Sequence, residues 1–86
     1  MPIYLVHFTT DRPIDPLQAY ERHRLQPGLH LIESDASQSR VYHDIKAGLP
    51  RHTPLFVARL DHQPKFKGAD PGALAWVRPR FDGMTA

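Results

Sequence analysis

Cysteine is absent from this chain of 86 residues, so neither disulfide bonds nor thiolate-bound zinc can stabilise the fold. Long hydrophobic runs are also missing, and no stretch approaches the roughly 18–20 apolar residues that span a bilayer. The N-terminus does not pair a basic region with an apolar one, as a signal peptide does. We therefore expect a cytoplasmic protein without a membrane partner.

A large excess of charge of one sign is missing as well. Lys and Arg number 11 and Asp and Glu number 9, which gives a net charge of +2. This weakly basic balance permits a nucleic-acid partner without requiring one. The length corresponds to one small domain with a modest core, and association with a second copy is a common remedy for such a core.

The alternation and spacing of apolar residues predict a complete β-α-β-β-α-β unit. Asp15 before Pro16 is typical of a helix start, and Pro27 with Gly28 indicates a turn. Asp35 with Gln38 resembles a capping box, and the helix that follows ends near Ala47. The predicted strands are 2–10, 22–25, 29–34 and 54–61, and the predicted helices are 16–21, 35–47 and 71–77.

This order predicts an α+β, ferredoxin-like fold with a four-stranded antiparallel sheet and a short C-terminal helix. Strands one and three pair in this fold. We expect residues 1–78 to form the single domain and residues 79–86 to form a frayed tail.

Both faces of the predicted sheet are mainly apolar. If the helices cover the face that bears Tyr4, Val6 and Phe8, most of the opposite face is still apolar, whereas a water-facing sheet alternates with polar residues. An apolar patch of this kind usually marks an interaction surface, so we predict a homodimer. The alternative is that the C-terminal helix folds back over this face. The predicted interface residues are Leu5, His7, His30, Ile32, Leu55, Val57, Arg59 and Trp76.

Three local patterns carry a family resemblance: the Leu-Ile-Glu-Ser-Asp strand at 31–35, the Leu-Phe-Val-Ala-Arg-Leu strand at 55–60, and the short C-terminal helix around Trp76. Together with the aliphatic first strand, they make residues 2–78 resemble the small CRISPR adaptation subunit and, more closely, the stand-alone bacterial relatives of that subunit. The virulence-associated protein D toxins share the architecture. The resemblance implies homodimers whose sheets pack face to face.

The resemblance also implies, for some members, a magnesium-dependent nuclease with an aspartate at the end of the first strand. Thr9 stands at that position in this chain, and threonine lacks the negative charge that magnesium prefers. Asp11 is the nearest acid and is a weak candidate for the metal, although a turn aspartate is the simpler interpretation. We assign no catalytic residue and no cofactor, with magnesium only under the nuclease alternative.

The remaining candidates are basic. Five cations are candidate phosphate contacts: Arg22, Arg24, Arg40, Lys46 and Arg51. Two histidines and an arginine are expected to lie together on the second sheet face: His7, His30 and Arg59. The leading hypothesis is a non-catalytic dimeric module of this family that contacts RNA, DNA or a protein partner. The alternatives are the nuclease with Asp11 and a small-molecule-binding dimer that uses the His7, His30 and Arg59 cluster.

Overall fold

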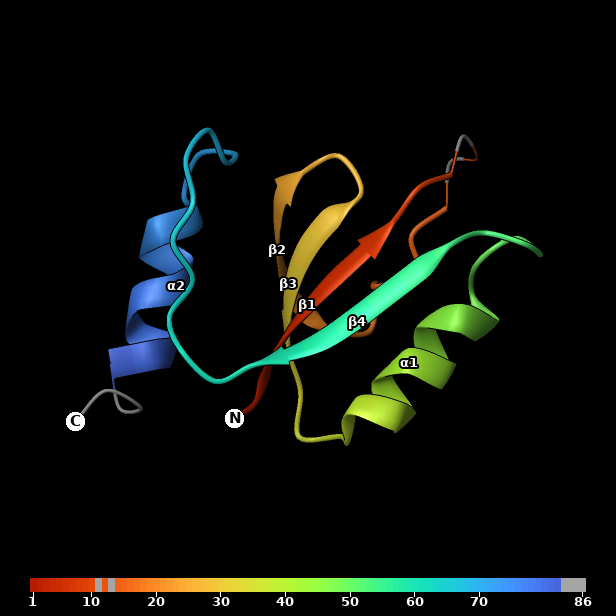
Figure 1. Cartoon of the computed structure of the whole chain (residues 1–86), viewed down its shortest axis with the longest axis horizontal. Coiled ribbons are helices and arrows are strands. Elements are labelled where there is room, and N and C mark those ends of the chain that lie inside the picture. Colours follow the sequence, from red (N-terminus) through yellow and green to blue (C-terminus); the bar gives the residue numbers. More distant parts are fainter. Residues whose placement is uncertain (11, 13, 83–86) are drawn as a thin grey trace.

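The computed structural model describes residues 1–10, 12 and 14–82 of the chain. Within this range one antiparallel sheet has the strand order β2-β3-β1-β4, and the two helices lie on its two sides (Figure 1). In chain order the elements are β1 (Ile3–Phe8), β2 (Glu21–Gln26), β3 (Leu29–Glu33), α1 (Gln38–Ala47), β4 (Leu55–Leu60) and α2 (Ala73–Phe81). The predicted α+β class, the four-stranded sheet, the β1–β3 pairing and the C-terminal helix are confirmed.

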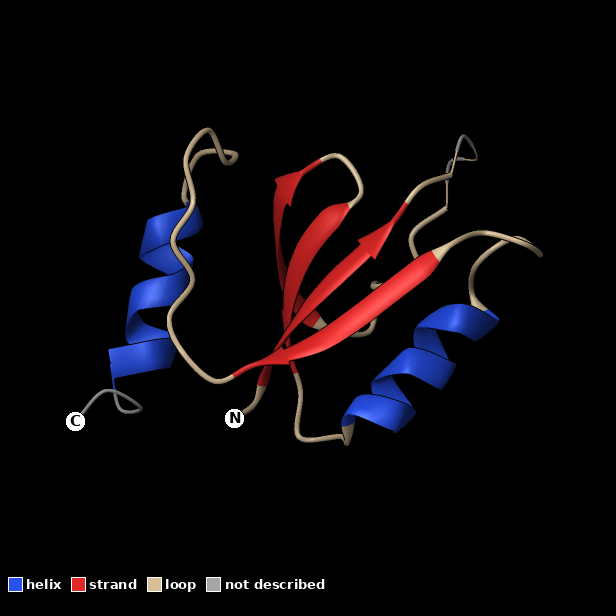
Figure 2. Ribbon diagram, viewed as in Figure 1, coloured by secondary structure: helices blue, strands red, loops and turns tan. Residues whose placement is uncertain are grey.

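Residues 16–19 of the β1–β2 connection form a turn, and the helix predicted over 16–21 is not formed (Figure 2). Asp15 still acts as a local cap, because its Oδ1 accepts a hydrogen bond of 3.2 Å from the Leu17 backbone N–H. Strand β2 begins at Glu21, so too few residues remain to nucleate a helix against its entropic cost. Leu17 is nevertheless buried, and Tyr20 packs against the same core cluster.

Helix α1 begins later than its predicted cap. The N-cap is Ser37, whose Oγ accepts a hydrogen bond of 3.2 Å from the Arg40 backbone N–H. Serine at this position satisfies one of the free N–H groups of the first turn. Val41 and Ile45 are spaced four apart and are fully buried against β1 and β3. This side of the sheet therefore holds the first core cluster.

Helix α2 packs on the opposite side of the sheet and forms the second core cluster. Ala73, Val77 and Phe81 recur every four residues and are buried with Ile3 and Leu31. The helix extends to Phe81, so residues 79–81 belong to it and not to the predicted frayed tail. The alternative weighed for the second face, a C-terminal helix folded over it, is thus what the structure contains. No helix in the described ranges has the length and apolar character needed to cross a membrane.

The strand register corrects the predicted composition of the two faces. Leu5 lies opposite Leu31 of β3 and Ala58 of β4, so these three residues share the α2 side. The α1 side instead receives five residues that we expected on the other face: His30, Ile32, Leu55, Val57 and Arg59. A register change of one residue moves every side chain of a strand to the other face. Both the odd and the even positions of these strands carry apolar residues, so the sequence pattern did not determine the register.

Candidate anion-binding pocket

A pocket of about 600 Å³ opens on the α1 side of the sheet, beside the turn that replaces the predicted first helix. Phe8 and His30 come from β1 and β3, Arg22 and Arg24 come from β2, and Asp15 comes from the β1–β2 connection. The hairpin between β2 and β3 forms a further wall. The pocket therefore lies where the turn at 16–19 leaves this part of the sheet without a helical cover.

Alternation along β2 places two cations in this pocket. Arg22 pairs in register with Ile32, and Arg24 pairs with His30. Side chains of paired residues in an antiparallel sheet point to the same face, so both arginines share the face that bears His30. Glu21 and His23 alternate with them and point to the α2 side. The sequence Glu-Arg-His-Arg thus delivers two guanidinium groups to one side of an edge strand.

Each arginine is oriented by an aspartate from a connecting segment. Arg22 Nη2 lies 2.6 Å from Asp15 Oδ2, and Arg24 Nε lies 2.6 Å from Asp70 Oδ2. The Asp70 segment is anchored to β2, because the Asp70 backbone N–H donates to the Leu25 carbonyl at 2.8 Å. A guanidinium has five N–H donors, so each ion pair leaves donors for a further anion.

His30 forms the floor of the pocket. Its ring lies nearly parallel to the Phe8 ring, with an interplanar angle of 8° and centroids 5.4 Å apart. Burial lowers the His30 pKa, and the neighbouring Arg22 and Arg24 lower it further, against an opposite effect of Asp15 and Asp70. The imidazole is therefore neutral at neutral pH, and the positive charge of the pocket comes from its arginines.

Gly28 holds the β2–β3 hairpin against the end of β1. The Phe8 backbone N–H donates to the Gly28 carbonyl at 2.9 Å. Gly28 has a φ of +81°, and a Cβ at this position would collide with the Phe8 carbonyl oxygen. The turn predicted at Pro27 and Gly28 is confirmed, and it fixes one rim of the pocket.

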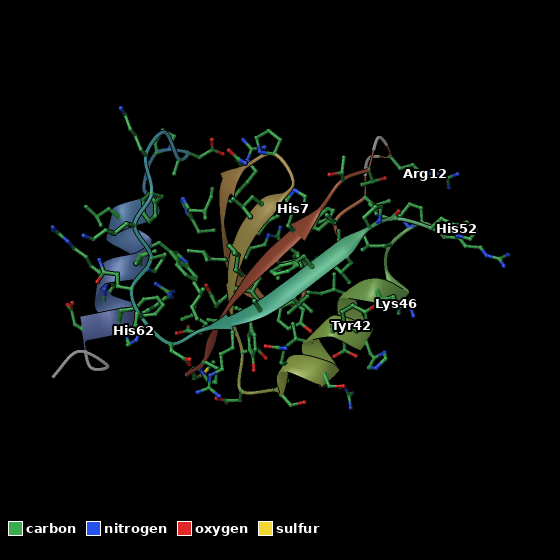
Figure 3. The ribbon with its side chains drawn as sticks, in the orientation of Figure 1. His7, Arg12, Tyr42, Lys46, His52 and His62 are labelled. Atoms are coloured by element: carbon green, nitrogen blue, oxygen red, sulfur yellow. The ribbon has the colours of Figure 1, made fainter. Side chains whose placement is uncertain are left out.

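The five predicted phosphate contacts fall into two groups. Arg22 and Arg24 line the pocket, whereas the other three are exposed on or just after α1: Arg40, Lys46 and Arg51. Figure 3 shows Lys46 on α1 and well apart from Arg12, another pocket-lining cation, which follows β1. Leu17 lines the pocket and also packs in the cluster that contains α1. Only two of the five predicted contacts therefore belong to the pocket lining.

The predicted cluster of His7, His30 and Arg59 is wrong. His7 pairs with Leu29 and with Phe56 and lies on the α2 side, whereas His30 and Arg59 lie on the α1 side. Even there His30 and Arg59 stand on β3 and β4, with β1 between them. The small-molecule site drawn from these three residues is thus not assembled.

The same strand register places the predicted dimer-interface residues on two different faces of the sheet. Of the named interface residues only Leu5, His7 and Trp76 lie on the α2 side of the sheet, and Trp76 is a half-buried part of the second core cluster. The Arg80 guanidinium covers the Trp76 ring at 3.9 Å. Phe56, beside His7, is 57% exposed, so the β4 part of this side stays open. Self-association remains a prediction.

Asp11, the candidate metal ligand, lies outside the described residues. Thr9 is exposed directly after β1. Among the described side chains, no three of His, Cys, Asp or Glu come close enough together to hold a metal ion. The magnesium-dependent nuclease therefore stays a prediction without a site in the described part of the chain.

Comparison of the chain with protein-family models, with curated proteins and with solved structures gives no match. The candidate site therefore rests on geometry. Sequence reasoning named Arg22, Arg24 and His30 but did not place them together, and it did not assign Asp15 and Asp70 as their partners. Asp70 lies 46 residues from Arg24, and no local sequence pattern predicts a contact over that separation.

Proposed function

We propose that this protein is a non-catalytic binding module that contacts nucleic acid through the pocket formed by Arg22, Arg24 and His30. The observation that supports the proposal is the pocket itself, in which two arginines from one strand flank a neutral aromatic floor. Arginine suits phosphate because its planar fork donates two parallel hydrogen bonds. The ion pairs with Asp15 and Asp70 hold both forks in place before a ligand arrives.

Single-stranded nucleic acid fits this pocket better than a duplex. Proteins that bind single strands combine cationic side chains with aromatic rings on which bases stack, and Arg22, Arg24 and the half-buried His30 ring supply both. Two phosphate contacts predict that the logarithm of the binding constant falls with the logarithm of salt with a slope of about −1.4 for a single strand.

The test is fluorescence anisotropy with labelled single- and double-stranded RNA and DNA, at several salt concentrations. We expect the single strands to bind, and the double variant Arg22→Ala/Arg24→Ala to lose about tenfold or more in affinity. This size follows because a hydrogen bond to a charged group contributes about 1.5–3 kcal/mol, and about 1.4 kcal/mol is a factor of ten.

The matched control is Arg40→Ala/Arg51→Ala, which removes the same charge from the α1 group. This variant is expected to bind nearly as well as the wild type. Equal losses in the two double variants would show that binding is spread over the surface, and the pocket would be rejected as the site. Absence of binding to all four nucleic acids would reject the proposed function.

A further inference from the structure

The pocket is an open hollow, and its size suits one small ligand unit. Its volume of about 600 Å³ lies within the range of about 300–1,000 Å³ that is typical of small-molecule sites. Asp15, Pro16 and Leu17 close one side, and Pro27 and Gly28 close another. The cations on and just after α1, Arg40, Lys46 and Arg51, are not part of this lining, so the pocket can hold one ligand unit without them.

The floor of the pocket is a flat aromatic surface. Phe8 is only 7% exposed, so its ring is covered, while His30 is half-buried and lines the pocket. The two rings stack with an interplanar angle of 8°, and a third planar ring on His30 would extend the stack. Nucleic-acid bases stack on histidine as they do on the other aromatic side chains.

The cations stand beside this surface at a position suited to a phosphate. Arg24 is the register partner of His30, and Arg22 lies two residues along the same strand face. A terminal phosphate carries a charge of about −1.5 to −2 at pH 7 and presents three acceptor oxygens. A phosphate within a strand carries one negative charge. The guanidinium donors that Arg22 and Arg24 keep beyond their ion pairs with Asp15 and Asp70 therefore favour the terminal group, which presents more acceptor oxygens.

We infer that the pocket binds a single nucleotide unit that carries a terminal phosphate, with the base on the His30 ring and the phosphate between Arg22 and Arg24. This inference rests on the proposed function and narrows it to one ligand class. Two sources share this chemistry: a free nucleoside monophosphate and the phosphorylated end of a single strand. The protein would thus recognise a nucleotide or a strand end, and would not read an internal run of phosphates.

The experiment is a competition against a labelled, 5′-phosphorylated single-stranded RNA in the anisotropy assay. The competitors are AMP, adenosine, inorganic phosphate, and one unlabelled hexanucleotide prepared with a 5′-phosphate, a 3′-phosphate or neither. We expect AMP to compete about tenfold or more better than either adenosine or inorganic phosphate, because base stacking and phosphate binding add. One of the phosphorylated hexanucleotides should exceed the unphosphorylated one by a similar factor.

Variants at His30 separate stacking from charge. His30→Ala should remove the advantage of AMP over inorganic phosphate, whereas His30→Phe should keep it because a flat ring remains. Arg24→Ala should weaken AMP and inorganic phosphate alike. The folding of each variant is checked by its cooperative thermal unfolding, and His43→Ala, on the outer side of α1, serves as the neutral histidine control.

The competition results distinguish a free nucleotide from a strand end as the ligand. Competition by AMP equal to that of the phosphorylated hexanucleotide identifies the free nucleotide as a sufficient ligand, and a clear preference for the hexanucleotide identifies the strand end. Hexanucleotides that compete equally with and without a terminal phosphate would overturn the inference and leave the proposed function standing. Failure of the labelled RNA to bind would overturn the inference, and failure of all four nucleic acids to bind would overturn both.

Discussion

The α1 side of the sheet has two parts, and they differ in what covers them. Under α1, Tyr4, Val6, Val41 and Ile45 are almost completely buried in one apolar cluster. Beside the β1–β2 turn, the same side carries a half-buried histidine and two exposed arginines around a pocket. One side of the sheet therefore carries two separate sets of residues: the buried cluster stabilises the fold, and the exposed set around the pocket is available for binding. A ten-residue helix closes the first part, whereas a turn too short for a helix leaves the second part open.

The largest expected effect comes from breaking the closed part. Ile45→Ala removes a fully buried side chain and should lower the free energy of unfolding by about 2–5 kcal/mol, through lost burial and the cavity left behind. Chemical denaturation measures this change. The exposed neighbour variant Lys46→Ala should stay within about 0.5 kcal/mol of the wild type, and a similar loss in both variants would contradict the assignment of the core.

The hairpin rim of the open part is tested next, at Gly28. Gly28→Ala places a side chain at positive φ, which costs about 1–2 kcal/mol, and adds a collision with the Phe8 carbonyl oxygen. Gly68→Ala is the matched control, because Gly68 has a φ of +78° and open space around its Cα. Thermal unfolding should show the larger loss for Gly28→Ala, and equal losses would mean that the hairpin does not press on β1.

A smaller effect on stability is expected when the pocket is changed. Arg24→Ala breaks an ion pair whose side chains are 57% and 32% exposed, and such surface pairs contribute only about 0–1 kcal/mol. The same variant should reduce nucleic-acid binding much more than stability. A loss of stability comparable to that of Ile45→Ala would show that the pocket is part of the folding core and would break the proposed division.

The finest test uses the His30 pKa. Because Arg24 lowers this pKa and Asp70 raises it, Arg24→Ala should raise the value and Asp70→Asn should lower it. NMR titration of the six histidines measures both changes, and shifts of the same sign in the two variants would contradict the pocket geometry. A phosphate bound between the arginines should raise the His30 pKa, because a nearby anion favours the imidazolium.

The same shift has a consequence for stability. A histidine whose pKa is lowered by folding binds fewer protons in the native state than in the unfolded state once the pH falls below about 6.5. Stability should therefore be unaffected by His30 above that pH and should decline as the pH falls through the folded pKa. The decline should be smaller in His30→Phe, which is measured by denaturation at pH 7 and pH 5.

Local signals predicted most of the elements but not their contacts. Val41 and Ile45 sit at helical spacing, and Pro27 with Gly28 marks a hairpin, so these features were predictable from the sequence. The helix expected after Asp15 does not form because Glu21 already belongs to β2. Local helix propensity is overridden where a residue can instead pair in a sheet. Leu17, within the range predicted as helix, is nevertheless buried in the first core cluster, since an apolar side chain is buried whether its backbone turns once or forms a helix.

The candidate site shows the same limit. Arg22 and Arg24 share a face by simple alternation, and this was readable from the sequence. Their position opposite His30, the ring of Phe8 beneath it and the ion pair with Asp70 all depend on how β1, β2 and β3 are aligned. Where both the odd and the even positions of a strand are apolar, its register is decided by loop lengths and by packing on both sides of the sheet.

The sequence by itself determined that this chain forms a small α+β domain with four strands and a C-terminal helix, because periodicity and turn residues act over a few neighbouring positions. Only the tertiary structure decided which side chains share each face, that α2 covers the second side, and that a cationic pocket opens where a helix was expected. These features arise from contacts between residues far apart in the chain. Their pairing depends on how all four strands and both helices pack together.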